Sequence, residues 1–318
     1  MKKVIPLIGI LLISWVIVNN PLSNTYVDSL KSNGVAVGVN KNALYDEINQ
    51  QANHYRVEPE NAKLDPVWKA IPGINGLEVD VDASYKNMKS SGKFNEKKLV
   101  FKQVKPSVHL TDLPPTPIYK GNPNKQMVSF VINVAWGNEY LPDILAILKK
   151  YHIKASFFLE GRWTQKNPDL AKMIVETGNE LGNHSYTHPD MSKISSAQTE
   201  EEITKTNDVI KATTGKGVTW FAPPSGSYNM ETVKVANEYK LGTVMWSIDT
   251  IDWRKPTPDE LIERVTGKVH NGAIILMHPT ASTTNALEEL IIQIQKKGLE
   301  INTVTEMLSE ERNVVNKK

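Results

Sequence analysis

The chain has 318 residues, of which 40% are hydrophobic and 23% charged, and its formal net charge is +2. This composition is that of a globular protein, and the length allows one large domain plus a smaller one. The near-neutral charge gives no sign of a nucleic-acid partner, and the absence of cysteine excludes disulfides, thiolate metal sites and a cysteine nucleophile.

Residues 1–22 have the pattern of an export signal. Lys2 and Lys3 precede a nearly continuous apolar run from Val4 to Val18. That run has the length of a signal-peptide core and is short for a helix that spans a membrane. No convincing small-residue cleavage site follows, so the segment is predicted to be either a cleaved signal peptide or a signal anchor. The protein is therefore expected outside the cytoplasm, either secreted or anchored to the cell membrane.

Three segments precede the main domain. A polar segment over residues 23–56 contains one expected helix, from Asn42 to Tyr55, with apolar residues near one face. Residues 57–113 are predicted to form a small α+β domain with half-buried strands. A Pro-rich linker over residues 114–126 follows and gives the clearest domain boundary in the chain.

Apolar strands alternate with helical stretches from residue 127 to residue 308, and a charged tail occupies residues 309–318. The expected strands are Val128–Ile132, Ala155–Leu159, Glu180–Gly182, Val218–Phe221, Thr243–Trp246, Ala273–Met277 and Leu299–Val304. This alternation predicts a parallel sheet in an α/β domain. About seven such strands can form a deformed (β/α) barrel, in which the chemistry lies at the carboxyl ends of the strands.

His184 and His188 follow one of these strands and place two imidazoles in one loop. Pro189 keeps the pair out of helical geometry, which distinguishes it from a helical zinc-protease motif. Two histidines can hold one side of a divalent metal, but catalytic zinc needs about three protein ligands. The end of an earlier strand, where a third ligand is expected, reads Asn133-Val134. Taken alone, the pair is more simply interpreted as two surface histidines in a turn.

Three further strand ends carry residues that can bind or react. The first ends in a Pro-Pro turn, whose backbone amides can bind an oxyanion. The second ends in an acidic run before a tryptophan, and the third ends in a histidine. Singly, these are an ordinary turn, a helix cap and a core histidine, but four such sites at successive strand ends indicate a functional site. The residues concerned are Pro223, Pro224, Ser225, Gly226, Asp249, Asp252, Trp253, Leu276 and His278.

With these motifs in place, the sequence from about Lys125 to Leu308 resembles the polysaccharide deacetylase family, the NodB-homology domain of carbohydrate esterases. The run from Ile144 to Leu159 looks like the family's first helix and second strand. In that family an Asp-Asp pair ends the first strand; one Asp is the general base, and the other joins two histidines on a divalent metal such as zinc. An Arg orients the base, and another Asp orients a later His, which protonates the leaving amine. The resemblance implies metal-assisted hydrolysis of an acetamide.

Part of this set is present in the chain. The resemblance assigns the following residues: His184 and His188 as metal ligands, Asp252 as the orienting Asp, His278 as the general acid, and Trp253 and Leu276 as the walls of the groove. The turn Pro223-Pro224-Ser225-Gly226 matches the family's substrate turn, although Ser225 replaces the usual Tyr.

The other part of the set is missing. Asn133 stands at the position of the base, Val134 at that of the metal-binding Asp and Ala222 at that of the Arg. Because the Arg pairs with the base, an Arg next to a neutral Asn133 would be a buried unpaired charge. The three losses are therefore consistent with one another, and zinc is expected to bind weakly or not at all.

The sequence thus predicts a polysaccharide deacetylase-like envelope protein that acts on or binds N-acetylated cell-wall glycan, with weak or no ordinary catalysis. Its expected partner is a peptidoglycan-like or chitooligosaccharide-like glycan, without nucleic acid. The N-terminal apolar segment is its expected contact with the membrane.

Three interpretations stay open. A working deacetylase would need a replacement base and a third ligand, for which the nearest carboxylates in sequence are Asp190, Glu139 and Asp249. A glycan-binding pseudoenzyme would use aromatic residues in the old groove, namely Trp136, Trp246, Trp253 and Tyr228. An envelope scaffold or assembly protein would carry its function in the N-terminal segments.

Overall fold

The computed structural model describes residues 43–312, which form two compact units. One unit contains residues 43–55 and 79–100, and the other contains residues 56–78 and 101–312. The apolar run expected to direct export lies outside the described residues. Within the part of the chain that the structure describes, no helix is both long enough and apolar enough to cross a membrane.

The smaller unit consists of short helices. They are α3 (Ala43–Ala52), η1 (Asn53–Tyr55), α4 (Val81–Met88) and η2 (Glu96–Lys98). Helix α3 buries Leu44 and Ile48, which lie four residues apart on one face. Helix α4 begins where the Asp80 side chain accepts a hydrogen bond from the backbone of Ala83, as an N-cap does. The helix expected near Asn42–Tyr55 is therefore present.

Two small sheets precede the main sheet in the chain. Strand β1 (Lys63–Asp65) pairs antiparallel with β2 (Lys69–Ile71), and β3 (Gly76–Val79) pairs with β4 (Phe101–Val104). The segment expected to be a linker belongs to the larger unit. Its residue Ile118 is 3% exposed and forms isolated β-bridges with Lys69 and Val244. The bounds of the two compact units differ from those of the expected segments, since residues 56–78 and 101–126 belong to the same unit as the barrel.

The main sheet is parallel and confirms the expected deformed barrel. Its strands are β5 (Met127–Val134), β6 (Ser156–Leu159), β7 (Glu180–Asn183), β8 (Trp220–Phe221), β9 (Gly242–Thr243), β10 (Ile248–Asp249), β11 (Ile274–Met277) and β12 (Glu300–Asn302). Seven strands follow the order β10-β11-β5-β6-β7-β8-β9, and β12 pairs with β5. All eight residues of β5 are buried, as expected of a central strand covered on both faces.

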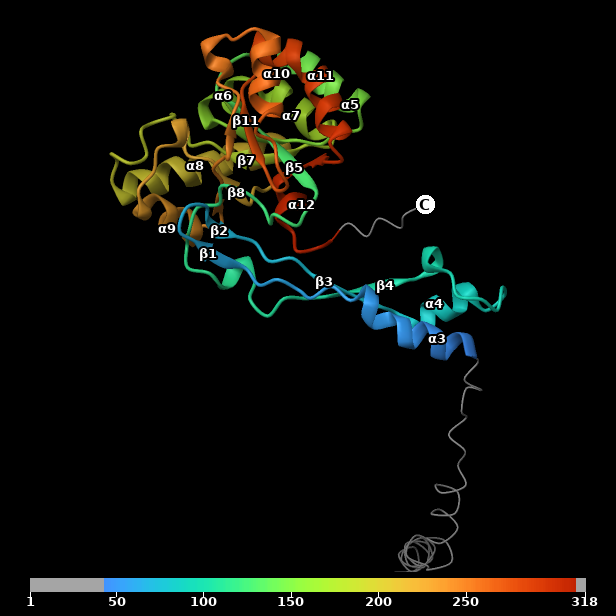
Figure 1. The fold of residues 1–318 in the computed structure, drawn as a ribbon. Helices are drawn as coiled ribbons and strands as arrows, with labels where there is room; N and C mark the ends of the chain where they lie inside the picture. Colours follow the sequence, from blue (N-terminus) through green and yellow to red (C-terminus); the bar gives the residue numbers. More distant parts are fainter. Residues whose placement is uncertain (1–42, 313–318) are drawn as a thin grey trace, which may run out of the picture. The chain divides into compact units, whose positions relative to one another are not determined.

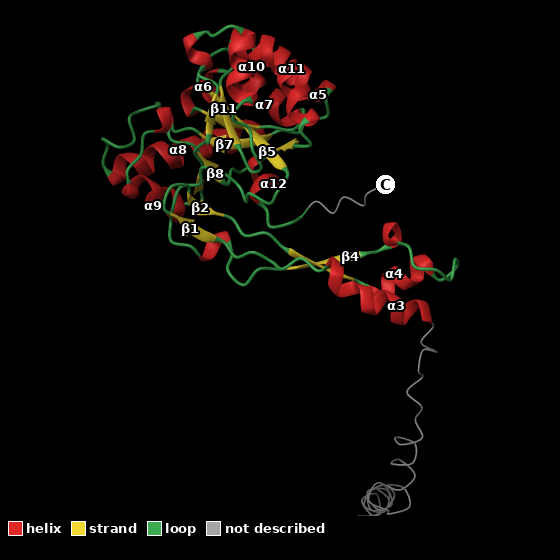
Figure 2. Ribbon diagram, viewed as in Figure 1, coloured by secondary structure: helices red, strands yellow, loops and turns green. Residues whose placement is uncertain are grey.

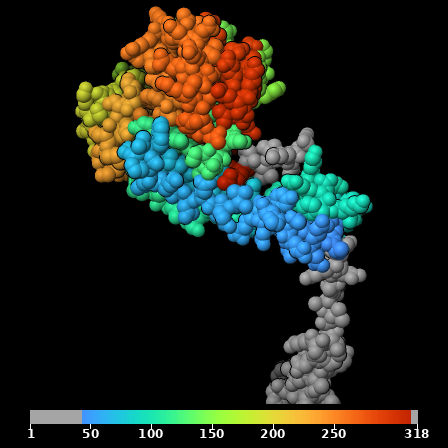
Figure 3. Space-filling view, in the orientation of Figure 1, coloured from blue at the N-terminus to red at the C-terminus, as the bar shows by residue number. Residues whose placement is uncertain are grey.

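Helices surround this sheet (Figures 1 and 2). They are α5 (Leu141–Lys150), α6 (Gly161–Lys166), α7 (Pro168–Glu176), α8 (Ser196–Thr214), α9 (Met230–Glu238), α10 (Pro258–Thr266), α11 (Ala281–Lys296) and α12 (Val304–Leu308), with the short turns η3 (Leu110–Asp112), η4 (Pro224–Gly226) and η5 (Asp252–Arg254). Prolines in the first turn help α5, α7 and α10 to begin, since proline lacks only an amide hydrogen that is unpaired there. Helices α10 and α11 pack side by side, and both are visible in orange and red in Figure 3.

Strand register brings the chemistry-bearing residues to one edge of the sheet. Val134 pairs with Leu159, which pairs with Asn183. On the other side of β5, Ile132 pairs with Met277, and Leu276 pairs with Asp249. The carboxyl ends of β5, β7, β10 and β11 therefore lie at the same edge, where ligands bind in folds of this type.

The expected strand Thr243–Trp246 is wrong in its bounds. The chain forms two shorter strands, β9 and β10, with Val244–Ser247 between them. The intervening Trp246 lines a cavity instead of extending a strand. The six-residue helix α6 was also not expected, because its short sequence shows no helical periodicity.

Candidate ligand-binding site

A cavity of about 460 Å³ lies at the carboxyl ends of the strands. Its walls are Asn133, Ala135, Trp136, His184, His188, Ser225, Trp246, Asp249, Trp253, Leu276 and His278. Most residues that the sequence singled out are thus brought together. Pro223, Pro224, Gly226 and Val134 do not line the cavity, and neither does Tyr228, whose hydroxyl is 2.8 Å from that of Tyr119.

The two loop histidines form one wall. Their ring centroids are 5.1 Å apart at an interplanar angle of 73°. His184 is 2% exposed, and its Nδ1 lies 2.7 Å from the carbonyl oxygen of Ala222. A neutral imidazole that donates from Nδ1 keeps its Nε2 lone pair for a ligand.

Burial disfavours the charged form of both histidines. The pKa of His184 falls to about 3, chiefly because burial disfavours the charged ring and also because of its neighbour His188. Burial lowers the pKa of His188 as well. Neutral imidazole is the form that binds a metal, so this wall is chemically suited to donate two nitrogen ligands.

A third ligand does not join them. Val134 is fully buried in the hydrophobic core, and residues 43–312 contain no group of three histidine or carboxylate side chains arranged to hold a metal. The donor set therefore does not fit a catalytic zinc ion with three protein ligands. No neighbouring side chain among the described residues therefore supplies the ligand that the family resemblance places at position 134.

The three carboxylates that could replace the missing ones are engaged or distant. Asp190 binds Lys193 at 2.9 Å and accepts hydrogen bonds from Ser192 and Ser227, which together hold the pKa of Asp190 well below its usual range. Glu139 is exposed and does not line the cavity. Asp249 does line it, but its Oδ1 accepts a hydrogen bond from the backbone of Ile251 at 2.8 Å.

Asn133 has an unusual environment. It is 3% exposed, it lines the cavity, and its Oδ1 has no hydrogen-bond partner among the described residues. A buried amide oxygen without a partner costs about 1–3 kcal/mol. Unlike an aspartate, this neutral amide cannot take a proton from water near pH 7, so it cannot act as a general base.

The pair Asp252–His278 is intact. Asp252 is completely buried, and its Oδ1 lies 2.8 Å from Nδ1 of His278. Its Oδ2 accepts hydrogen bonds from the His278 backbone and, at 2.7 Å, from the hydroxyl of Thr283. The carboxylate thereby fixes the orientation of the imidazole. Trp136 stacks on the His278 ring with centroids 5.8 Å apart and planes 10° apart.

Aromatic and apolar side chains complete the walls. Trp253 is 51% exposed, whereas Leu276 is 3% exposed and forms part of the core beneath the cavity. The turn η4 holds Ser225 in the left-handed region at φ 53°, and a β-carbon on Gly226 would lie 2.7 Å from the Trp246 ring. Glycine is therefore required there for the turn to approach Trp246 so closely.

Ala222, at the position of the missing Arg, is fully buried in a hydrophobic cluster with Val131, Phe158 and Leu276. A guanidinium group there would lie among apolar side chains. Since Asn133 is neutral, that charge would also lack a carboxylate partner from β5. A charged side chain at position 222 would therefore be costly in this chain.

Sequence reasoning missed some residues that shape this site. Thr283 binds Asp252 from α11, 31 positions along the chain, and no local motif marks it. The hydroxyl groups of Ser192 and Ser227 donate hydrogen bonds to Oδ1 of Asp190, which is therefore engaged by other groups. Ala135 lines the cavity, and its small apolar side chain carries no signal.

This barrel, with a cavity lined by His184, His188 and His278 at its strand ends, defines a class of protein. Residues 120–244 match the family model for polysaccharide deacetylase. A peptidoglycan-N-acetylglucosamine deacetylase of Bacillus cereus is 32% identical over 201 residues, which cover 61% of this chain and 73% of the relative. The uncharacterized protein YlxY of Bacillus subtilis is 52% identical over 314 residues and 98% of each chain. The chain belongs to the polysaccharide deacetylase family.

Solved structures agree with this assignment. The crystal structure of BA3943, a CE4 family pseudoenzyme from Bacillus anthracis, is 55% identical, has a TM-score of 0.81 and covers 85% of this chain and 96% of its own. A mutant of BA3943 with restored enzymatic activity has the same TM-score at 54% identity, covering 85% of this chain and 99% of its own. This chain is therefore similar over most of its length to a family member whose ordinary activity is lost.

Proposed function

We propose that this protein binds N-acetylated cell-wall glycan in the cavity at the strand ends, with weak or no hydrolysis, on the outer side of the cytoplasmic membrane. The relatives that carry an activity in their names act on peptidoglycan, which supports a glycan ligand. The N-terminal apolar run, with two lysines before it, supports export or anchoring.

The observation that carries this proposal is the contrast between the two sides of the cavity. The side that shapes a sugar site is intact, with exposed Trp253, buried Leu276 and the Asp252–His278 pair. The side that would activate water carries the amide of Asn133, and Val134, at the expected position of the metal-binding Asp, is buried in the core and does not line the cavity. Binding of a sugar needs the first set of residues and not the second.

Asn133 gives the cavity a group that suits an acetamide better than a carboxylate does. An amide side chain both donates and accepts hydrogen bonds, as the acetamide of an N-acetylated sugar also does. Trp253 offers a face for the sugar ring, and Leu276 an apolar contact for the acetyl methyl group.

Binding of the sugar in this cavity is not expected to depend on a metal ion. His184 and His188 offer two nitrogen ligands, whereas a catalytic zinc ion takes about three protein ligands. With two protein ligands, the expected zinc affinity is low. Binding of the sugar therefore depends on the shape, the stacking surface and the hydrogen bonds of the chain's own residues.

Titration of the full chain with matched oligosaccharides tests the proposal. An N-acetylglucosamine tetramer is expected to bind with a Kd between about 10 μM and 1 mM, or about −7 to −4 kcal/mol. The glucosamine tetramer, which lacks the acetyl groups, is expected to bind at least tenfold more weakly. Equal affinities, or no binding of the acetylated tetramer, would contradict the proposal.

The Trp253→Ala variant is expected to weaken binding of the acetylated tetramer, because it removes the exposed stacking surface. Trp220→Phe is a matched aromatic control, since Trp220 lies in β8 and does not line this cavity. The control is expected to bind as the unaltered chain does.

A further inference from the structure

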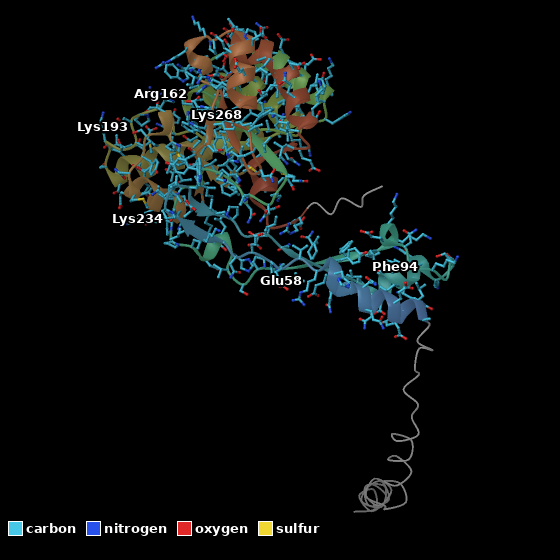
Figure 4. All side chains as sticks on the ribbon, viewed as in Figure 1. Glu58, Phe94, Arg162, Lys193, Lys234 and Lys268 are labelled. Atoms are coloured by element: carbon cyan, nitrogen blue, oxygen red, sulfur yellow. The ribbon has the colours of Figure 1, made fainter. Side chains whose placement is uncertain are left out.

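A second cavity has a volume of about 690 Å³. Several of its lining residues directly follow Trp253, a residue of the ligand-binding cavity, in the sequence. This second cavity is formed by the end of η5, the loop that follows it, and one side of α10. Its walls are Ile251, Arg254, Lys255, Pro256, Glu260, Glu263, Arg264, Gly267 and Lys268. Figure 4 labels Lys268, on the turn that follows α10.

Positive charge dominates this cavity. Four cations, Arg254, Lys255, Arg264 and Lys268, face two carboxylates, and none of the four forms an ion pair with any residue between 43 and 312. One carboxylate is already engaged, since Glu260 accepts a hydrogen bond from the backbone of Thr257 at 2.8 Å. The four cations and two carboxylates give the cavity a net charge of +2, and one buried donor, Nε of Arg264, has no hydrogen-bond partner among the described residues.

The helix dipole accounts for only half of these cations. Arg264 and Lys268 lie at the C-terminal end of α10, where positive charge is favourable. Arg254 and Lys255 precede Thr257, the N-cap of the same helix, where the dipole disfavours positive charge. A cluster that places cations near both ends of one helix around a single cavity needs another explanation, and an anionic ligand supplies one.

The backbone connects this cavity to the proposed sugar site. Trp253 lines the first cavity, and the next residue, Arg254, lines the second. The Arg254 guanidinium lies 4.7 Å from the centroid of the Trp253 ring, which positions the charge at the rim of the sugar site. Because consecutive residues line the two cavities and their side chains are in contact, one glycan strand that stacks on Trp253 would pass next to Arg254.

We propose that this basic cavity, residues 251–268, binds a carboxylate on an acidic sugar of the same glycan strand whose N-acetylated sugar occupies the first cavity. This inference rests on the proposed function, because it assigns a second subsite to the same ligand. The planar forks of Arg254 and Arg264 match the geometry of a carboxylate, and Lys255 and Lys268 add charge without fixed geometry. The ligand is thus an acidic polysaccharide rather than a neutral one.

Three tetrasaccharides, titrated against the full chain by calorimetry, test this inference. The first contains only N-acetylglucosamine, the second alternates it with N-acetylmuramic acid, whose lactyl group carries a carboxylate, and the third is the methyl ester of the second. The acidic tetramer is expected to bind about five- to tenfold more tightly than its ester. Raising the salt concentration from about 0.05 to 0.5 M is expected to remove this advantage, since exposed charges are screened.

Two charge-removing variants locate the effect. Lys255→Gln and Arg264→Gln are expected to reduce the preference for the acidic tetramer while leaving the affinity for the neutral tetramer unchanged. Lys172→Gln, which removes an exposed cation on α7, is the matched control and is expected to change neither.

The outcomes separate the two proposals. Equal affinity for acid and ester, or an equal loss in Lys172→Gln, would overturn the acidic subsite while leaving the sugar site in place. Failure of the neutral tetramer to bind, with the acidic one still bound through Lys255 and Arg264, would overturn the sugar site alone. If none of the tetramers binds, both are wrong. If inorganic phosphate at millimolar concentration abolishes the acid preference and binds with the same dependence on Lys255, the ligand is a phosphate and the assignment of a carboxylate is wrong.

Discussion

The Nδ1 atom of His278 lies 2.8 Å from Oδ1 of Asp252, and this pair forms in a cavity whose wall carries Asn133 in place of a carboxylate. The second oxygen of Asp252 is also satisfied, by the His278 backbone and by Thr283. A carboxylate that is completely buried and fully hydrogen-bonded stabilises the fold around it as well as orienting the imidazole. The pair therefore has a structural role that does not depend on hydrolysis.

Removal of the Thr283 hydroxyl tests this structural role. Thr283→Val keeps the shape of the side chain but leaves the buried Asp252 carboxylate with one hydrogen bond fewer. We expect the free energy of unfolding to fall by about 1–3 kcal/mol, measured by denaturant titration. Thr284→Val, whose hydroxyl bonds only to the backbone of Thr280, is the control and is expected to lose less than about 1 kcal/mol. Equal losses in both variants would show that Asp252 does not depend on Thr283.

Zinc binding should depend on position 134. In the family the residue at this position is a metal-binding Asp, so one zinc ion per chain is expected to bind to Val134→Asp. Without zinc the same variant is expected to be less stable than the unaltered chain, because it buries a charge in the core. Val134→Asn has nearly the same shape and no charge, and is the control. Zinc measured by mass spectrometry after dialysis gives the stoichiometry; tight one-to-one binding to the unaltered chain would contradict the account.

The three lost residues should act as a unit when restored. Ala222→Arg alone is expected to destabilise the protein by about 3 kcal/mol, because the charge is buried without a partner. Adding Asn133→Asp is expected to recover much of this loss, and a double-mutant cycle measures the coupling. Hydrolysis is expected only when Asn133→Asp and Val134→Asp are combined, and the triple variant with Ala222→Arg should be the most active. Additive gains from the single changes would contradict this dependence.

Acid should destabilise the protein through His184. Its folded pKa of about 3 lies below the ordinary value of 6.5, so the unfolded chain takes up a proton that the folded chain does not. The contribution is complete above about pH 6.5 and is lost as the pH falls toward 3, at up to about 1.4 kcal/mol per pH unit. His184→Asn keeps a donor for the Ala222 carbonyl and should flatten the pH dependence of unfolding between pH 6.5 and 5. His152→Asn, at an exposed histidine, should not.

The fold was predictable where the sequence pattern is strong. Strand β5 lies in an apolar run and is buried along its whole length, and the helices between strands have apolar faces. Strands β8, β9 and β10 have two residues each, and such short pairings leave no periodic signal, which explains the error over Thr243–Trp246.

For the site, the sequence predicted only the residues that lie at strand ends or that match the family's motifs. Among these residues, Asn133, His184, Trp253 and His278 line one cavity. The partners that set the chemistry come from distant segments. Thr283 donates a hydrogen bond to Asp252, and Lys193 forms an ion pair with Asp190. The spacing of residues in the sequence does not predict either contact.

The most direct test of the central claim is one NMR experiment that observes the protein and its ligand in the same tube. The isotopically labelled full chain is mixed with the N-acetylglucosamine tetramer, and free acetate is followed over a day. We expect the Trp253 indole and His278 signals to shift on binding, while the acetate signal stays at the level of a sample without protein. Accumulation of acetate at the rate of the triple variant Asn133→Asp, Val134→Asp and Ala222→Arg, or the absence of any shift at Trp253 and His278, would contradict the account.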